Sequence, residues 1–256
     1  MRVLVCVKRV PAPGARINIT ADGQAVDTAY LAFTTSPHEE CAVEEAVQLV
    51  ERHGGEATVL TLGPAEADEQ LRYAASLGVA KAVLLPITDA DWDPQRTAAA
   101  IATAIADIET VDGAFDVILF GNESADSGGY QVGVRVARSL GRPVVNGIKG
   151  IALHDDGTIR ARRESEAGVE VYVLPTPVVL GVKEGINLPR YPTLKGRLGS
   201  KKITVEHLEA MAAAGGQHMV TLMQAAEQVS NTIILGHGPD AAAAVVDMLE
   251  ELGVLK

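Results

Sequence analysis

One stretch of the chain has the composition of a phosphate-binding loop. It runs over residues 121–133 as Gly-Asn-Glu-Ser-Ala-Asp-Ser-Gly-Gly-Tyr-Gln-Val-Gly and directly follows an apolar run, Asp116–Phe120. A glycine-rich turn between a parallel strand and a helix presents backbone N–H groups, and the positive helix end attracts phosphate. Gly128 and Gly129 would let a ligand approach the backbone closely. The stretch predicts a nucleotide site, although an ordinary tight turn before a capped helix has the same composition.

The spacing within this stretch excludes the commonest nucleotide sites. It matches neither G-x-G-x-x-G nor G-x-x-x-x-G-K-[ST], so it indicates neither a dinucleotide dehydrogenase nor a P-loop NTPase. An ATP pyrophosphatase would carry S-G-G-x-D-S after the first strand, where this chain has Val7–Pro11. That enzyme class is therefore set aside. Asp126 or Ser127 is the expected N-cap of the helix that follows.

A second segment, residues 182–202, has the composition of a protein docking surface. Pro189 and Pro192 fix φ and remove backbone donors, so we expect neither a regular helix nor a central strand there. Leu188, Leu194 and Leu198 lie among basic residues, in a chain whose net charge is −11. The basic residues, set against the single Glu184, are Lys183, Arg190, Lys195, Arg197, Lys201 and Lys202. Composition alone suits a solvated loop equally well.

Alternating strand-like and helix-like patterns must position these segments. Apolar runs predict four strands, at Val3–Val7, Ala57–Leu62, Ala82–Leu85 and Asp116–Phe120. The expected helices run from Pro37 to Gly54 behind a capping box of Ser36 and Glu39, from Ala65 to Leu77, from Pro94 to about Ile108, and up to about Leu140. Four such units predict an α/β fold with a doubly wound, mostly parallel, Rossmann-like sheet covered on both faces.

The last part of the chain departs from this alternation. Ile148–Leu153 and Thr158–Arg163 predict a hairpin, while Val169–Leu174 and Pro177–Val182 predict further strands at the sheet edge. A linker over residues 211–216, a strand at Thr232–Leu235 and a helix at Pro239–Leu252 are expected to form an arm against a partner. We therefore expect a nucleotide-binding domain over 1–182, a docking segment over 183–210, and the linker and arm over 211–256.

Composition excludes several function classes. With 33 acidic against 22 basic residues, nucleic acid is not an expected partner. Cys6 and Cys41 are expected to be buried structural thiols, and no metal site or catalytic triad is indicated. We expect His38 and His154 to be isolated and solvated. With no targeting segment and no long apolar run, a soluble cytoplasmic protein is expected.

Several separated motifs together resemble the electron transfer flavoprotein beta subunit family. They are the start VLVCVKRV, residues 36–46 (SPHEECAVEEA, with Ser36 where asparagine is usual), Thr61–Pro64, the loop with Asp126 and Gln131–Gly133, Arg163-Glu164 before Gly168, and N-x-P-R-Y-P-T-L over 187–194 before a lysine-rich run. These motifs are in the family's order, and the resemblance covers roughly residues 1–210.

The resemblance implies a bound adenine nucleotide at the carboxyl edge of the sheet. The residues implied are Cys6, Ser36, Pro37, His38, Glu39, Leu62, Gly121, Asn122, Ser124, Asp126, Ser127, Gly128, Gly129, Tyr130, Gln131, Val132 and Gly133. The usual second aspartate and threonine of the loop are absent, so Ser127 or the backbone must replace some contacts. The implied ligand is AMP, or a second FAD in beta subunits that bifurcate electron pairs.

For function, the resemblance implies a heterodimer with an alpha subunit that carries most of an FAD, with Arg163 and Glu164 near the flavin. Some members place a tyrosine near the flavin after the first strand; this chain has none over 12–15. Such a carrier passes electrons from acyl-CoA dehydrogenases of fatty acid beta-oxidation, or similar flavoenzymes, to a quinone reductase, without substrate chemistry of its own. The implied docking residues, with Leu194 as the anchor, are Pro189, Arg190, Tyr191, Leu194, Lys195 and Arg197. The alternative from another class is a flavin-free regulatory module that binds an adenine nucleotide, which would need neither docking segment nor arm.

Overall fold

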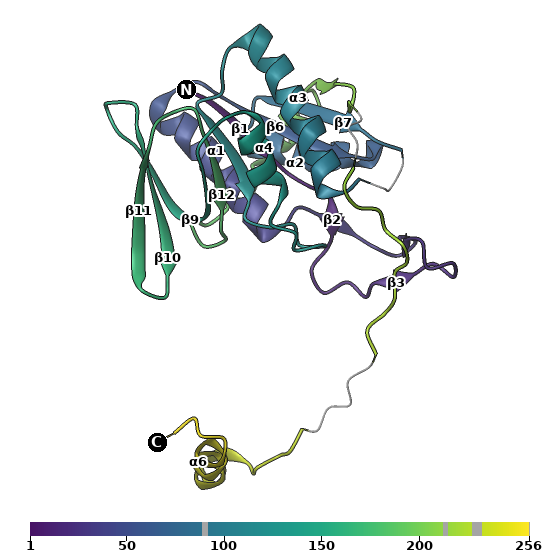
Figure 1. Cartoon of the computed structure of the whole chain (residues 1–256), viewed down its shortest axis with the longest axis vertical. Helices are drawn as coiled ribbons and strands as arrows, with labels where there is room; N and C mark the ends of the chain where they lie inside the picture. The colour runs from purple at the N-terminus through teal and green to yellow at the C-terminus, as the bar shows by residue number, and fades with distance from the viewer. Residues whose placement is uncertain (89–91, 212–214, 227–231, 256) are drawn as a thin grey trace. The chain divides into compact units, whose positions relative to one another are not determined.

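The computed structural model describes residues 1–88, 92–211, 215–226 and 232–255. It divides into two compact units, Met1–Leu222 and Met223–Lys256 (Figure 1). The central part of the expected linker, residues 212–214, lies outside the described residues.

A nine-stranded sheet forms the centre of the first unit. Its order is β11-β10-β9-β12-β8-β1-β6-β7-β13, and all neighbouring strands are parallel except in the pairs β9–β10 and β10–β11, which are antiparallel because β10 runs against the rest. The bounds are β1 Arg2–Cys6, β6 Glu56–Gly63, β7 Lys81–Pro86, β8 Val117–Gly121, β9 Val144–Leu153, β10 Ile159–Ser165, β11 Gly168–Leu174, β12 Val178–Val182 and β13 Val205–His207. Two small antiparallel sheets pair β2 (Val10–Pro11) with β5 (Phe33–Thr34), and β3 (Asn18–Ile19) with β4 (Val26–Asp27).

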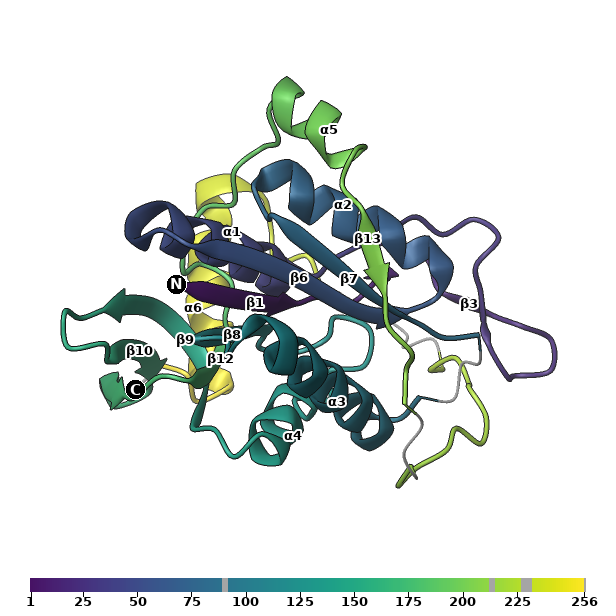
Figure 2. The same ribbon diagram turned by 90° about the horizontal axis from the view of Figure 1, so that it is seen from above.

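Helices cover both faces of this sheet (Figure 2). On one face α1 (Pro37–His53) and α2 (Asp68–Leu77, after the 3-10 turn η1 at Ala65–Ala67) pack on the inward valines and leucines of β1, β6 and β7. On the other face α3 (Pro94–Asp112) and α4 (Val132–Ser139) enclose a second core that includes Phe115. The α/β, doubly wound, mostly parallel fold predicted from the sequence is confirmed.

Local sequence explains where α1 begins. The Ser36 hydroxyl accepts a hydrogen bond from the Glu39 N–H, and the Glu39 carboxylate accepts one from the Ser36 N–H. Pro37 occupies the first turn, where its missing N–H costs nothing, and Gly54 ends the helix at a φ of 72°. This capping box fixes the end of α1 that points toward the carboxyl edge of the sheet.

The strand order creates a crevice at that edge. The chain passes from β1 through β6 to β7 on one side, and α3 then returns it to β8 on the other side of β1. In open α/β sheets, ligands bind outside the carboxyl ends of the strands at the point where the winding reverses. Here that point lies between β1 and β8.

Four expectations about local structure were wrong. Strand β12 lies between β8 and β9 and not at the edge, as its wholly buried sequence Val-Val-Leu-Gly-Val would suggest. The docking segment contains a helix, α5 (Leu194–Ser200), because the prolines precede it and Thr193 caps it. Helix α4 begins after Gln131, without the expected side-chain cap. Residues 232–235 form no strand, since β-branched composition alone does not supply a pairing partner.

The second unit ends in a helix. The 3-10 turn η2 (Gly238–Ala241) leads into α6 (Ala242–Glu251), close to the expected bounds. Val245 and Val246 of α6 are 41% and 45% exposed, and Ile233 and Ile234 are more exposed still.

Candidate functional site

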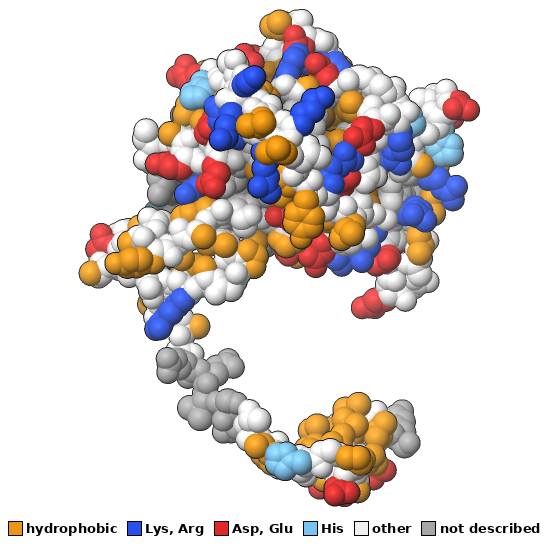
Figure 3. All heavy atoms as spheres, turned by 180° about the vertical axis from the view of Figure 1, so that it is seen from behind, with side chains coloured by type: hydrophobic (Ala, Val, Ile, Leu, Met, Phe, Trp, Pro, Cys, Tyr) orange, Lys and Arg blue, Asp and Glu red, His pale blue; other side chains and the backbone are white. Residues whose placement is uncertain are grey.

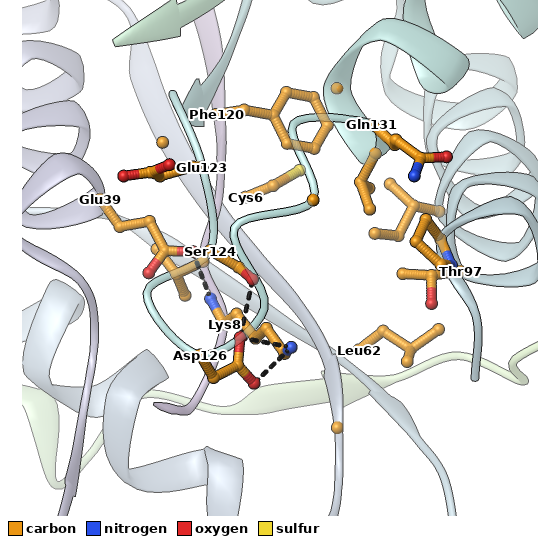
Figure 4. A pocket seen from close by; sticks show the side chains of 18 of the residues that line it. Cys6, Lys8, Glu39, Leu62, Thr97, Phe120, Glu123, Ser124, Asp126 and Gln131 are labelled. Carbon is orange, nitrogen blue, oxygen red and sulfur yellow. Dashed lines mark hydrogen bonds and ion pairs between the residues drawn. The ribbon is translucent and has the colours of Figure 1, made fainter. Parts of the chain in front are cut away.

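A cavity of about 380 Å³ lies at the crevice between β1 and β8 (Figure 4). Its walls come from the ends of β1, β6 and β8, the loop 121–131, and the first turns of α3 and α4. The predicted nucleotide residues that line it are Cys6, Glu39, Leu62, Gly121, Asn122, Ser124, Asp126, Gly129, Tyr130, Gln131, Val132 and Gly133. Ser36, Pro37, His38, Ser127 and Gly128 were also predicted but do not line it.

Glu39 is the buried carboxylate of this cavity. Its Oε1 accepts a hydrogen bond from the Lys8 N–H and its Oε2 one from the Ser36 N–H, each at 2.9 Å. Burial raises its pKa to about 7, and these hydrogen bonds offset only part of that shift. Gly121 passes so close that a Cβ there would lie 2.7 Å from the Glu39 Cγ. The end of β8 and the start of α1 are therefore packed directly together.

Two cations beside the cavity were not among the predicted site residues. The Lys8 Nζ contacts both carboxylate oxygens of Asp126, at 2.6 and 2.9 Å. Burial pushes the pKa of Asp126 upward, but the Lys8 ammonium and the Ser124 hydroxyl hold it below its ordinary value. The Arg9 guanidinium lies over the Phe33 ring, 3.4 Å from its centre, and its buried Nε has no hydrogen-bond partner among the described residues. A Lys-Arg pair directly after the first strand was the signal that could have identified both.

The loop 121–131 is shaped to expose its backbone. Gly128 and Tyr130 have φ values of 54° and 53°, and for tyrosine this left-handed conformation is strained. The loop is tied together by the Ser124 hydroxyl, which contacts Asp126 and Ser127, both at 2.7 Å. At its end, α4 begins at Val132, so the free N–H groups of its first turn border the cavity. The arrangement suits an anionic group held by backbone donors, with Lys8 and Arg9 nearby.

The docking segment is exposed as expected. The side chains of Leu188, Tyr191 and Leu194 are 89%, 91% and 75% exposed, and Leu198 is 54% exposed. The basic side chains of the same segment are exposed as well, at Lys183, Lys195, Arg197, Lys201 and Lys202. Figure 3 looks onto this side of the unit, where apolar and basic side chains alternate on the surface.

Comparison with known proteins identifies the family. The profile of the electron transfer flavoprotein domain matches residues 25–213. The electron transfer flavoprotein subunit beta of Bacillus subtilis is 36% identical over 174 residues, which are 68% of this chain and 66% of that protein. The subunit beta of Syntrophomonas wolfei is 35% identical over 216 residues, 83% of this chain and 81% of its own. Protein FixA of Azorhizobium caulinodans is 34% identical over 192 residues, 73% of this chain and 67% of its own.

The chain belongs to the electron transfer flavoprotein beta subunit family. An electron transfer role, in association with a flavin, therefore follows from its relatives. Among the described residues, no helix has the length and apolar character needed to cross a membrane. No cluster of His, Cys, Asp and Glu in the described part could hold a metal ion.

In this beta-type subunit, Arg163 and Glu164 do not pair with each other. The Arg163 guanidinium contacts Glu170 at 2.6 Å and donates to the Tyr172 hydroxyl at 2.6 Å, while Glu164 contacts Lys149 at 3.0 Å. The Arg163 stem lies beside Gly147, where a Cβ would be 3.3 Å from its Cδ and 3.9 Å from the Asn122 Oδ1. Arg163 is thus close to the start of the loop that lines the cavity.

His154 and His38 differ in their exposure to solvent. His154 is exposed, as expected. The expectation that His38 is solvated was wrong, since its side chain is only 12% exposed. Its Nδ1 accepts a hydrogen bond from the Glu184 N–H at 2.8 Å, and its Nε2 lies 3.4 Å from Glu123. His38 therefore joins the cavity loop to the start of the docking segment. Cys6 and Cys41 are buried free thiols, as expected.

Proposed function

We propose that the chain is the beta subunit of a heterodimeric electron transfer flavoprotein that binds AMP in the cavity between β1 and β8. The observation that carries this proposal is the cavity itself. It lies at the winding reversal of a parallel sheet and is bordered by a helix N-terminus and two cations. In this role the protein positions cofactors and recognises partners, without substrate chemistry of its own.

The size of the cavity favours a mononucleotide. Its volume of about 380 Å³ is near the lower end of small-molecule pockets, which span roughly 300–1,000 Å³. A dinucleotide such as a second FAD would need the cavity to extend beyond the described walls. The buried, unpartnered Nε of Arg9 and the N–H groups at the start of α4 would bind the phosphate, and Cys6, Leu62 and Ile101 offer an apolar wall for the base. A bifurcating subunit that binds a second FAD is therefore the less favoured alternative.

The FAD of the alpha subunit is proposed to lie near the Arg163 side of the first unit. When bound, a flavin accepts an electron pair and can release the electrons singly. The residues of this chain would contribute a fixed positive group, since Arg163 is held by Glu170 and Tyr172. The exposed apolar residues of the C-terminal unit, including Val245 and Val246, are proposed to contact the alpha subunit.

Docking to an electron donor is proposed to use the exposed surface around Leu194. A few apolar side chains ringed by lysine and arginine suit a transient complex with a protein whose own apolar pocket has an acidic rim. Charge then raises the encounter rate, and Leu194 supplies selectivity. An acyl-CoA dehydrogenase or a similar flavoenzyme is the proposed donor, and a quinone reductase the proposed acceptor. Of the docking residues implied by the resemblance, Pro189, Tyr191, Leu194, Lys195 and Arg197 are proposed to contact the donor, whereas Arg190 pairs with Glu44 and Glu51 of α1.

One experiment tests the cofactor assignment. The chain is produced together with an alpha subunit, the purified complex is denatured, and the released nucleotides are separated and counted. We expect one FAD and one AMP per heterodimer. Two FAD molecules would replace the simple carrier with the bifurcating form. If an adenine nucleotide but no flavin is released, the proposed electron carrier is wrong and the flavin-free regulatory module takes its place.

A further inference from the structure

The docking segment is held against α1 by ion pairs and hydrogen bonds of Arg190. The Arg190 guanidinium contacts Glu44 through Nε and Nη2, each at 2.9 Å, and reaches Glu51 at 2.6 Å through Nη1. The backbone N–H of Arg190 also donates to Glu44, at 3.1 Å. The Glu44 side chain is 3% exposed, so no partner protein can reach it. The Arg190 guanidinium is therefore held by α1, with the side chain still 35% exposed, while the neighbouring Tyr191 is 91% exposed.

A second contact with α1 lies three residues earlier. The Asn187 Nδ2 donates to the Cys41 carbonyl at 3.0 Å and to Glu45 at 3.1 Å. The Cys41 thiol in turn donates to the Asn187 carbonyl at 3.7 Å. Leu188 lies between Asn187 and Arg190, so the backbone on both sides of this exposed leucine is fixed to one helix.

The far end of the segment is held by α2. The Arg72 guanidinium donates to the carbonyls of Ser200, Lys201 and Ile203, at 3.0 to 3.4 Å. These carbonyls include the end of α5, which a cation stabilises. Arg72 is itself held by Asp68, whose Oδ2 lies 2.6 Å from the Arg72 Nε. Helix α5, which carries Leu194 and Leu198, is thus fixed at the end opposite Arg190.

We propose that Arg190 and Arg72 are positioning residues that hold the Leu188–Tyr191–Leu194 surface in one conformation, and that Arg190 does not itself contact the electron donor. This inference rests on the proposed docking function. A surface that is already ordered loses less conformational entropy on binding, which matters most for a weak, transient complex. The apolar side chains can then be almost fully exposed and still be presented in a fixed arrangement.

Three variants separate positioning from direct contact. Glu44→Gln, Arg190→Gln and the double variant are made in the complete heterodimer. If Arg190 only positions the segment, all three weaken the donor interaction to a similar extent, because each breaks the contact between Arg190 and Glu44, and the remaining contact with the exposed Glu51 is screened by solvent. If Arg190 contacts the donor, Arg190→Gln and the double variant weaken it much more than Glu44→Gln. The control is Glu109→Gln, which removes the carboxylate of another ion pair, with Arg142, whose side chains are 15% and 8% exposed and which lies outside the segment.

The first readout, hydrogen exchange, needs no partner. We expect amide exchange over residues 186–194 to accelerate at least about tenfold in Glu44→Gln, since a charge-assisted hydrogen bond is lost. Exchange there should be unchanged in Glu109→Gln. If Glu44→Gln does not fold, Arg72→Gln tests the same idea from the α5 end, with acceleration expected over residues 195–203. Unchanged exchange in these segments overturns the proposal.

The second readout uses a substrate-reduced acyl-CoA dehydrogenase as the probe. We expect its KM to rise about three- to tenfold in Glu44→Gln, with kcat, the flavin content and the flavin spectrum unchanged. Leu194→Ala serves as the reference. If Leu194→Ala raises KM but Glu44→Gln does not, the positioning role is overturned and the docking function stands. If exchange accelerates but Leu194→Ala has no effect, the segment is positioned as proposed and the docking function fails.

Discussion

Helix α1 borders two regions, the cavity loop and the docking segment, that are held in place in different ways. At its first turn, the cavity loop 121–131 is held mainly by its own serines and by one ion pair, Lys8 with Asp126. Farther along, the docking segment is fixed to α1 and α2 through the partly buried side chains of Arg190 and Arg72. The carboxylates show the same contrast. Glu39, at the cavity, has its pKa raised to about 7 by burial, whereas Arg190 more than offsets the burial of Glu44 and lowers its pKa.

The contrast follows from what each region would bind. A small ligand can supply the missing contacts of a loop that wraps around it, so the loop can leave its donors open. A transient protein partner cannot order a segment without a loss of affinity, so that segment must already be ordered. The following changes test this difference, beginning with the largest expected effect.

Gly196→Ala should displace the docking segment. A Cβ at residue 196 would lie 2.2 Å from the Ser76 carbonyl oxygen of α2, which is backbone and cannot turn away. We expect α5 to shift from α2, electron transfer from the reduced dehydrogenase to fall more than about tenfold, and stability to fall by about 1–3 kcal/mol.

The matched control lies on the same helix. Gly199→Ala adds the same methyl group where no atom lies within 4 Å, and alanine favours the helix. Electron transfer should be unchanged in this variant. If electron transfer falls equally in both variants, the position of the docking segment depends on the glycine content of α5 and not on the close contact of Gly196 with Ser76.

Glu39→Gln should remove a pH dependence of stability that originates at the cavity. Because the folded pKa of Glu39 is raised, the folded state binds more protons than the unfolded state between about pH 4.5 and 7, and stability falls as the pH rises through that window. We expect a loss of roughly 1–3 kcal/mol across the window in the parent protein.

Urea unfolding at several pH values measures this slope. The slope should be smaller in Glu39→Gln and unchanged in Glu66→Gln, which removes an exposed carboxylate. Glu44 behaves in the opposite sense, because its lowered pKa confines its loss of stability to pH values below about 4.5. An equal slope in the parent and Glu39→Gln would place the pH dependence elsewhere.

The sequence predicted more of the fold than of the site. Periodicity and the Ser36–Glu39 capping box located the parallel strands and their helices, because those patterns are local. The position of β12 is set by long-range pairing, and its wholly buried sequence was the available signal. Glycine spacing and resemblance located the cavity loop, but not the cavity's cations.

Three-dimensional contacts decided the remaining assignments. Arg190 is in a basic stretch and looks like a surface residue, yet its partners Glu44 and Glu51 are 146 and 139 residues away. In the sequence His38 is an isolated histidine, but in the fold its Nδ1 accepts a hydrogen bond from the Glu184 N–H. Such pairs of distant residues leave no signal in one sequence.

Lys8→Met gives the smallest expected effect and addresses the cavity side of the comparison. If the loop leaves its contacts open for a phosphate, removal of the Lys8 ammonium should weaken AMP binding about three- to tenfold, because the lost interaction is partly solvated. The control is Lys81→Met, whose side chain is 46% exposed against 45% for Lys8, and which pairs with Asp112 and Glu56 away from the cavity. AMP retained through gel filtration, measured for both variants, distinguishes them. Equal retention would mean that Lys8 serves only to hold Asp126, and that the loop is as complete without its ligand as the docking segment is without its partner.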